Sequence, residues 1–237
     1  MKSMEKIDYT CINVNINDYL SMGKKRYKIP FVTANMSIPD KTNETNIPKY
    51  YIQNVNGIAV AITGISPFPE NLDTMNPKVT ATPPGDALKK LIPNLKTKSD
   101  VIVLLSQFPA ETTRKIVELA GVHPDLIISQ RSSRLVTENQ LNAIPYLIQI
   151  SDSCAAIETV TLTMDSKKQI TNCKTVRTKL GPHIDEDPAI LAITGENITK
   201  TIEQEVNNQI IKEAIELHKL SPEEYTEMLL KKQPKKE

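Results

Sequence analysis

The chain has 237 residues, of which 39% are hydrophobic, enough to build a sizeable core. Lysine plus arginine number 29 and aspartate plus glutamate 28, so no net charge attracts the chain to nucleic acid or to an acidic membrane. No run reaches the roughly 20 apolar residues of a membrane span, and the opening MKSMEKIDYT lacks the apolar region of a signal peptide. We therefore predict a soluble globular chain with no nucleic-acid partner and no membrane span.

The first part of the chain predicts alternating strands and helices. Residues 29–36 predict a compact strand, and residues 49–67 predict a hairpin about Asn56-Gly57, a dipeptide that favours the positive φ of a tight turn. The later elements are a helix over 82–99, a buried strand over 100–106, an amphipathic helix over 110–121 that ends at Gly121, and a buried strand over 124–129. Such alternation is typical of an α/β sheet covered by helices.

The pattern changes past residue 140, where β-prone runs separated by turns predict a second, antiparallel group of strands. Residues 198–219 carry a one-sided apolar stripe at helical spacing, and Ser221-Pro222 begins a second short helix. The final KKQPKKE predicts a solvated basic tail. We thus predict one α/β domain over residues 1–196 and a helical C-terminal tail over residues 197–237.

The three cysteines, Cys11, Cys154 and Cys173, are odd in number and form no C-x-x-C pair. Their spacing predicts neither a disulfide framework nor a zinc site, and we interpret them as buried free thiols.

The histidines and the acidic residues predict no metal site of a familiar kind. His123 and His183 lie beside prolines and His218 lies on the C-terminal helix, so no two of them have the spacing of ligands on one helix. Residues 184–188, IDEDP, lack the glycine turn and the final glutamate of a calcium loop, and we interpret them as a solvated turn. No phosphate-binding loop or nucleophile-elbow motif occurs. We predict no cofactor.

Several segments in order carry a resemblance to a known family. In chain order they are INVNINDYL, FVTAN, GIAVAITGISP, LLSQ, SQRSSR and IPYLIQISDSCAAIETVTLTMD. Over residues 10 to about 192 they resemble the metallophosphatase (N-terminal) domain of the 5′-nucleotidase family, within the calcineurin-like phosphoesterase superfamily. The resemblance implies an α/β sandwich of two mixed β-sheets flanked by helices, here lacking the first strands. It also suggests an exported protein, although the chain shows no signal peptide.

The resemblance further implies a site at the strand ends, where the family holds two divalent metal ions. INVNINDYL stands where the family has a GNHE loop, keeping Asn13 but placing Val14 at the histidine. Gln107 stands at the histidine of L-S-H, and Arg131 and Ser133 stand at the two histidines of G-H-x-H. The family's D-x-H and G-D motifs would lie upstream of residue 1. The implied protein is a pseudoenzyme without catalytic residues or metal ligands.

Neighbouring strand ends meet at one edge of a sheet, so we expect Asn13, Gln107, Arg131 and Ser133 to lie close together. Arg131 has two interpretations: its planar guanidinium suits a small anion, or it is an ordinary loop arginine. Gln107 and Ser133 are also compatible with ordinary strand-end polar residues, and Asn13 with a turn residue.

Three functions follow from these observations. The first is a non-catalytic binding or scaffold module, whose partner is another protein or a second copy bound through the C-terminal helix. The second is part of a metal-dependent phosphoesterase of the 5′-nucleotidase type, with the remaining ligands supplied by another segment. The third is a small-anion binder that uses Arg131.

The apolar stripe of the tail generates a prediction of its own. Because residues 198–219 carry too many aliphatic side chains on one side to remain in water, we expect the tail to dock within the chain or to mediate self-association. Truncation at residue 196 should lower the melting temperature or the solubility. An unchanged melting temperature together with an unchanged sedimentation profile would contradict this expectation.

Overall fold

The computed structural model describes residues 2–21, 28–38, 47–68, 72, 79–130, 145–150, 156–181, 184–185 and 187–193. Residues Ser3–Ile184 form one compact unit, and a second unit begins at Asp185. The predicted helical tail over 197–237 lies outside the described residues, as does Cys154. Among the described residues, no helix is long and apolar enough to cross a membrane.

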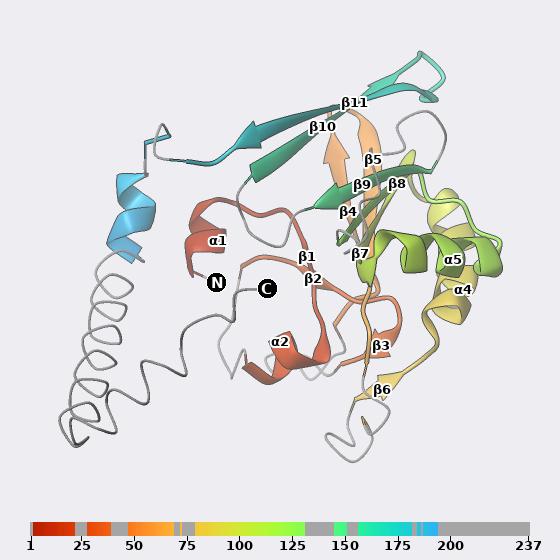
Figure 1. Ribbon diagram of the computed structural model, residues 1–237. Helices are drawn as coiled ribbons and strands as arrows, with labels where there is room; N and C mark the ends of the chain where they lie inside the picture. The colour runs from red at the N-terminus through yellow and green to blue at the C-terminus, as the bar shows by residue number, and fades with distance from the viewer. Residues whose placement is uncertain are drawn as a thin grey trace, which may run out of the picture. The chain divides into compact units, whose positions relative to one another are not determined.

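A five-stranded sheet forms the centre of the first unit (Figure 1). Its strands, in spatial order, are β4 (Tyr50–Val55), β5 (Ile58–Ile65), β7 (Val101–Pro109), β8 (Leu126–Gln130) and β9 (Tyr146–Ile150). Strand β4 is antiparallel to β5, and the other neighbours are parallel. The predicted hairpin is confirmed, with Asn56 and Gly57 at φ values of 52° and 84°, as a tight turn of this type requires.

Two helices cover one face of this sheet. They are α4 (Pro84–Lys96), which has Pro84 in its first turn, and α5 (Ala110–Ala120), which ends at Gly121 in the left-handed conformation. The apolar sides of both helices pack on Ile102, Leu104 and Ile127 of the sheet. Both predicted helices are confirmed.

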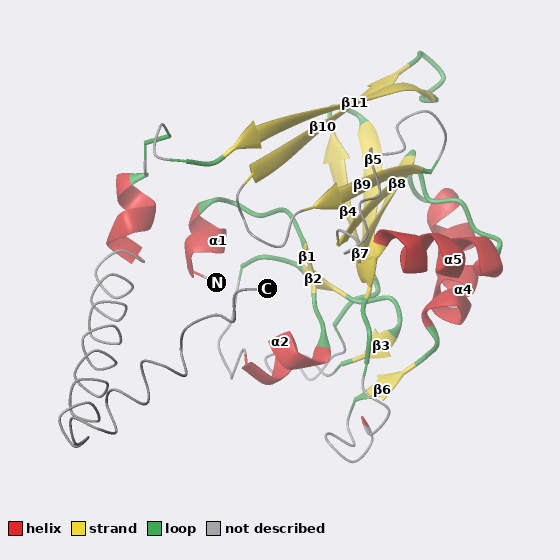
Figure 2. Ribbon diagram, viewed as in Figure 1, coloured by secondary structure: helices red, strands yellow, loops and turns green. Residues whose placement is uncertain are grey.

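The antiparallel hairpin of β10 (Ala156–Met164) and β11 (Ile170–Lys179) lies on the other face, as Figure 2 shows with the helices in red. Val160, Leu162 and Cys173 pack with Leu126 and Ile148 of β8 and β9. The result is a layered α/β fold, as predicted, in which the hairpin supplies the second β layer among the described residues.

Strand β9 corrects one prediction, because the region past residue 140 was expected to be antiparallel throughout. Residues 146–150 instead join the central sheet in parallel with β8. Four of these five residues are buried, which is the burial pattern of a parallel strand covered on both faces.

The remaining labelled elements of the first unit are short and precede β4 or connect the central sheet to the helices. They are α1 (Lys2–Lys6), β1 (Ile12–Asn13), α2 (Ile16–Ser21), β2 (Phe31–Val32), β3 (Met36–Ser37) and β6 (Thr80–Ala81). The single strand predicted over 29–36 is wrong, since β2 pairs with β1 and β3 pairs with β6. Between them, the Ala34 amide donates to the Gly64 carbonyl (2.7 Å), so the segment changes partner within a few residues.

Two of the cysteines lie in the described part. Cys173 is buried, as predicted, and Cys11 is half-buried. Burial raises the pKa of Cys11 to about 11, so its thiol stays protonated at neutral pH.

A repeated aspartate fixes the register of the parallel strands at their amino ends. Asp100 precedes β7, and its carboxylate accepts a hydrogen bond from the Ala59 amide of β5 (2.8 Å). Asp125 precedes β8 in the same way and accepts from the Ile102 amide of β7 (2.7 Å). The backbone amide of each aspartate also donates to the carbonyl of the same neighbour, Asp100 to Ala59 and Asp125 to Ile102. Two reciprocal bonds of this kind hold each strand start to its neighbour.

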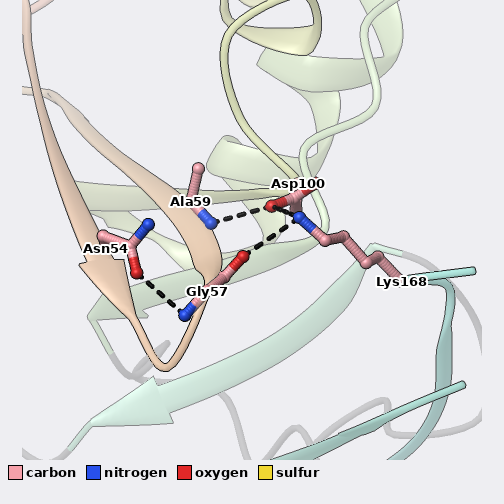
Figure 3. A network of polar contacts seen from close by, with 5 residues as sticks. All are labelled: Asn54, Gly57, Ala59, Asp100 and Lys168. Carbon is pink, nitrogen blue, oxygen red and sulfur yellow. Dashed lines mark hydrogen bonds and ion pairs between the residues drawn. The ribbon is translucent and has the colours of Figure 1, made fainter. Parts of the chain in front are cut away.

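Lys168 joins the hairpin to this end of the sheet, as Figure 3 shows. Its ammonium group donates to the Asp100 carboxylate (2.8 Å) and to the Gly57 carbonyl (3.0 Å). Asn54 accepts from the Gly57 amide (2.8 Å) and so holds the turn that Lys168 contacts. The turn between β10 and β11 is therefore tied to two strands of the central sheet.

The two aspartates predict opposite dependences of stability on pH. The hydrogen bond from Lys168 lowers the pKa of Asp100 below its ordinary value of 3.8, so this carboxylate stabilises the fold above that value and loses its contribution as pH falls through the lowered pKa. Burial raises the pKa of Asp125 above 3.8, so its contribution is complete at low pH and is lost as pH rises through the raised pKa.

Urea unfolding of Asp100→Asn and Asp125→Asn between about pH 3 and pH 6 measures this contrast. The difference in free energy of unfolding between the natural chain and Asp100→Asn should grow in favour of the natural chain as pH rises. The corresponding difference from Asp125→Asn should shrink as pH rises. The same pH trend in both variants would show that the two environments do not differ in this way.

Candidate functional site

The side chain of Asn13 bridges two strands at the carboxyl edge of the parallel sheet. Its amide nitrogen donates to the Ile65 carbonyl at the end of β5 (3.0 Å) and to the Leu105 carbonyl of β7 (3.2 Å). Asn13 is buried, so these bonds form away from bulk water, where an unpaired carbonyl would be costly. The segment that contains β1 is thereby fixed at the end of the sheet.

Gly64 makes this approach possible. A Cβ atom at this position would lie 2.2 Å from the Cγ atom of Asn13 and 2.3 Å from its Oδ1 atom, far inside contact distance. The amide group of Asn13 therefore occupies the space of the missing side chain, and no other residue type fits at position 64 without displacing it.

Gln107 and Asn15 extend the network from Asn13. The Asn15 side chain donates to the Gln107 Oε1 atom (2.7 Å), and the Gln107 Nε2 atom donates to the Asn13 carbonyl (3.1 Å). The expected proximity of Asn13 and Gln107 is confirmed, although they are 94 positions apart in the chain.

Asn15 is a member of this site that the sequence analysis did not single out. Its Oδ1 atom accepts from the Asp18 amide (2.8 Å) at the start of α2, and the Asp18 carboxylate accepts from the Asn15 amide (3.2 Å). This reciprocal arrangement is a capping box, and the spacing Asn15-Ile16-Asn17-Asp18 is a sequence signal for it. The cap holds Asn15 in place while its amide nitrogen reaches Gln107.

Asn35 and Ser66 form the second arm of the network. The Asn35 side chain donates to the Ser66 carbonyl (2.9 Å) and accepts from the Ser66 amide (3.0 Å). It thus makes the same two hydrogen bonds to the Ser66 backbone that a residue of a neighbouring strand would make. The Ser66 hydroxyl lies 3.4 Å from the Asn13 Oδ1 atom, to which it donates. Both residues are fully buried, and they connect the segment after β2 to Asn13.

The ends of β7 and β8 lie side by side, with Ser106 opposite Ser129. The Ser106 hydroxyl is hydrogen-bonded to the Thr113 hydroxyl of α5 (2.7 Å). The Ser129 hydroxyl is buried and has no hydrogen-bond partner among the described residues. Arg131 and Ser133, which follow β8, lie outside the described residues, so their place in the site and any anion bound by Arg131 stay predictions.

The groups at this edge are poor ligands for a pair of divalent cations. They are neutral amides and hydroxyls, and the side-chain oxygens of Asn13, Asn15 and Gln107 already accept hydrogen bonds. Stable sites for such ions use carboxylates and neutral imidazoles. Over the described ranges, no three His, Cys, Asp or Glu side chains gather in one place. The described residues of this edge do not fit a two-metal centre.

Comparisons with known proteins identify the fold. No protein-family model matches the chain, and no curated protein is similar to it in sequence. Among solved structures, the chain is similar to the sulfate thiohydrolase SoxB of Thermus thermophilus, with a TM-score of 0.60, 16% identity, and coverage of 80% of this chain and 36% of that one. A putative 5′-nucleotidase from Staphylococcus aureus gives a TM-score of 0.59 and 14% identity, and the match covers 79% of this chain and 41% of that one. The NAD nucleotidase of Haemophilus influenzae gives a TM-score of 0.58 and 17% identity, and the match covers 75% of this chain and 41% of that one.

These likenesses show that the chain has the fold of an N-terminal metallophosphatase domain, as the resemblance implied. At these identities they show the fold alone. The chain spans about two fifths of the length of the solved proteins that it matches.

Replacement of Gly64 tests how strictly the network depends on close packing. Gly64→Ala should destabilise the fold by about 3 kcal/mol, because the new methyl group displaces the buried amide of Asn13. In an Asn13→Ala background the same change should cost much less, since the clash is gone. Urea unfolding of the single and double variants measures both costs.

Gly85→Ala is the matched control. The nearest atom to a Cβ at Gly85, the Ile116 carbonyl oxygen, is 3.8 Å away, so this helical glycine has room for a methyl group. The variant should be as stable as the natural chain or slightly more stable. Additive costs for Asn13→Ala and Gly64→Ala would contradict the assigned packing.

Proposed function

We propose that this chain is a non-catalytic relative of 5′-nucleotidase-type metallophosphatases that acts as a binding or scaffold module for another protein. The observation that carries the proposal is the closed network of Asn13, Asn15 and Gln107, in which the polar groups at the carboxyl edge of the sheet bind one another. Groups engaged in this way are not free to bind metal ions or to activate water.

The position of Val14 supports the same conclusion. Val14 stands where the resembled family has a histidine, and it is fully buried among Ile16, Tyr19 and Met36. Its amide donates to the Val32 carbonyl (3.0 Å), which extends the β1–β2 pairing. The residue therefore contributes to an apolar core. A metal ligand in this setting would have to be charged or strongly polar, which burial among aliphatic side chains disfavours.

Gln107 supports it in a different way. This side chain stands at the position of another family histidine, yet it uses both ends of its amide to join Asn15 and the Asn13 backbone. An amide that donates from one end and accepts at the other suits this bridge, whereas a metal-bound imidazole has only one further nitrogen with which to make a contact. The residue is thus suited to holding the loop rather than a metal ion.

The proposal predicts that the purified chain binds neither zinc, manganese nor iron in stoichiometric amount. It also predicts no hydrolysis of a generic phosphomonoester above background. Elemental analysis after incubation with each metal, together with a colorimetric phosphatase assay, measures both properties. About two metal ions per chain would instead indicate a working two-metal centre and would favour the phosphoesterase alternative.

Gln107→Ala is the control for trace contamination. It should lower stability by about 1–2 kcal/mol, because two hydrogen bonds to partly buried groups are lost, while leaving metal content and background hydrolysis unchanged. Hydrolysis that disappears in Gln107→Ala, in a variant that remains folded, would assign catalysis to this chain and overturn the proposal.

A further inference from the structure

Strand β11 presents a long exposed edge. It has ten residues, most of them exposed, and it pairs with β10 in a two-stranded sheet. No strand of the described ranges pairs with its other edge, as can be followed in Figure 2. Backbone groups along such an edge are a template for an additional strand.

The end of the hairpin away from its turn differs from the end packed on the sheet. Near the turn, Leu162, Ile170 and Cys173 contact the central sheet. At the other end, two aliphatic side chains point into solvent: Ile157 is 54% exposed and Val176 is 49% exposed. Leu162 and Cys173 are paired and face the central sheet. Side chains alternate along each strand, so Ile157 and Val176, at odd spacings from them, are on the face turned away from that sheet.

The charges of β11 select among possible partners. The strand carries Lys174, Arg177 and Lys179 and no acidic residue. Arg177 forms an ion pair with Glu158 of β10, whereas Lys174 and Lys179 form none with the described carboxylates. A second copy paired on β11 would place this cationic strand against itself, and like charges on paired strands destabilise the pair. The edge therefore disfavours self-association and favours an acidic strand.

We propose that β11 binds an extended acidic segment of another polypeptide, which adds as a third strand to the β10–β11 hairpin. This inference rests on the proposed binding function and names its surface and the chemistry of its partner. Alternation along the strand places Lys174 and Val176 on one face and Lys179 on the other. The matching segment has carboxylates opposite Lys174 and Lys179 and a branched aliphatic residue opposite Val176.

A designed peptide tests the proposal directly. The core sequence Glu-Thr-Glu-Val-Thr-Glu, written to pair antiparallel with Lys179 back to Lys174, is titrated into the isotopically labelled full chain and followed by NMR. We expect shift changes and slowed amide exchange along 171–179. The peptide Lys-Thr-Lys-Val-Thr-Lys should bind more weakly by at least roughly tenfold, since attraction is replaced by repulsion at the paired positions.

Charge reversal on the protein should exchange these preferences. The double variant Lys174→Glu/Lys179→Glu should lose roughly tenfold in affinity for the acidic peptide and gain affinity for the basic one. The control Lys89→Glu/Lys90→Glu makes the same charge change at exposed positions of α4, on the opposite face of the sheet, and should bind the acidic peptide as the natural chain does. Thermal unfolding confirms that each variant is folded.

Three outcomes would overturn the proposal: no binding of the acidic peptide, equal binding of both peptides, or protection of amides elsewhere than β11. Concentration-dependent dimerisation that slows amide exchange along β11 would also overturn it and would identify a second copy as the partner. The metal and hydrolysis measurements judge the non-catalytic proposal separately. A chain that binds neither metal nor the acidic peptide would refute only the proposed role of β11 and would leave the non-catalytic proposal standing.

Discussion

The amide of Asn13 holds together the edge of the sheet on which the rest of the site depends. Two parallel strands end beside each other with carbonyl groups that need hydrogen-bond donors, and one side chain supplies both donors from a segment about 50 to 90 residues away in the chain. The contact is possible only because Gly64 leaves the space of its side chain empty. With Asn13 fixed, its backbone carbonyl orients Gln107, and its Oδ1 atom receives the Ser66 hydroxyl.

Among the described residues, the resulting edge is polar, neutral and largely self-contained, and a fold by itself does not fix the chemistry of its site. Amides bind other amides and backbone carbonyls across four segments of the chain, so the edge is ordered by its own hydrogen bonds. A site built in this way contributes stability and shape. Exposed, charged groups lie on β11, where Lys174 and Lys179 form no ion pair with the described carboxylates.

The opposite end of the sheet is organised by charge. Asp100 and Asp125 make the same contact to a neighbouring strand, yet one carboxylate faces Lys168 and the other is partly desolvated. The two ends of the parallel strands are therefore held by different interactions, with neutral amides at the carboxyl end and carboxylates at the amino end. Lys168 adds a link to the hairpin, which places β10 and β11 across the face of the sheet that the helices leave free.

The sequence by itself determined the elements whose signals are local: the turn at Asn56-Gly57, both covering helices with the end at Gly121, and the buried strands before Ser106 and Ser129. The resemblance also placed Asn13 beside Gln107. Only the tertiary structure decided that residues 29–36 divide between two pairings, that β9 joins the parallel sheet, and that Asn15, Asn35 and Ser66 complete the network. Periodicity and turn chemistry act over a few residues, whereas these choices depend on pairing between separate strands and on side-chain bonds to groups as many as 92 positions away. The packing of the whole sheet decides which distant carbonyl an asparagine side chain can reach. No local pattern in the sequence reports that packing.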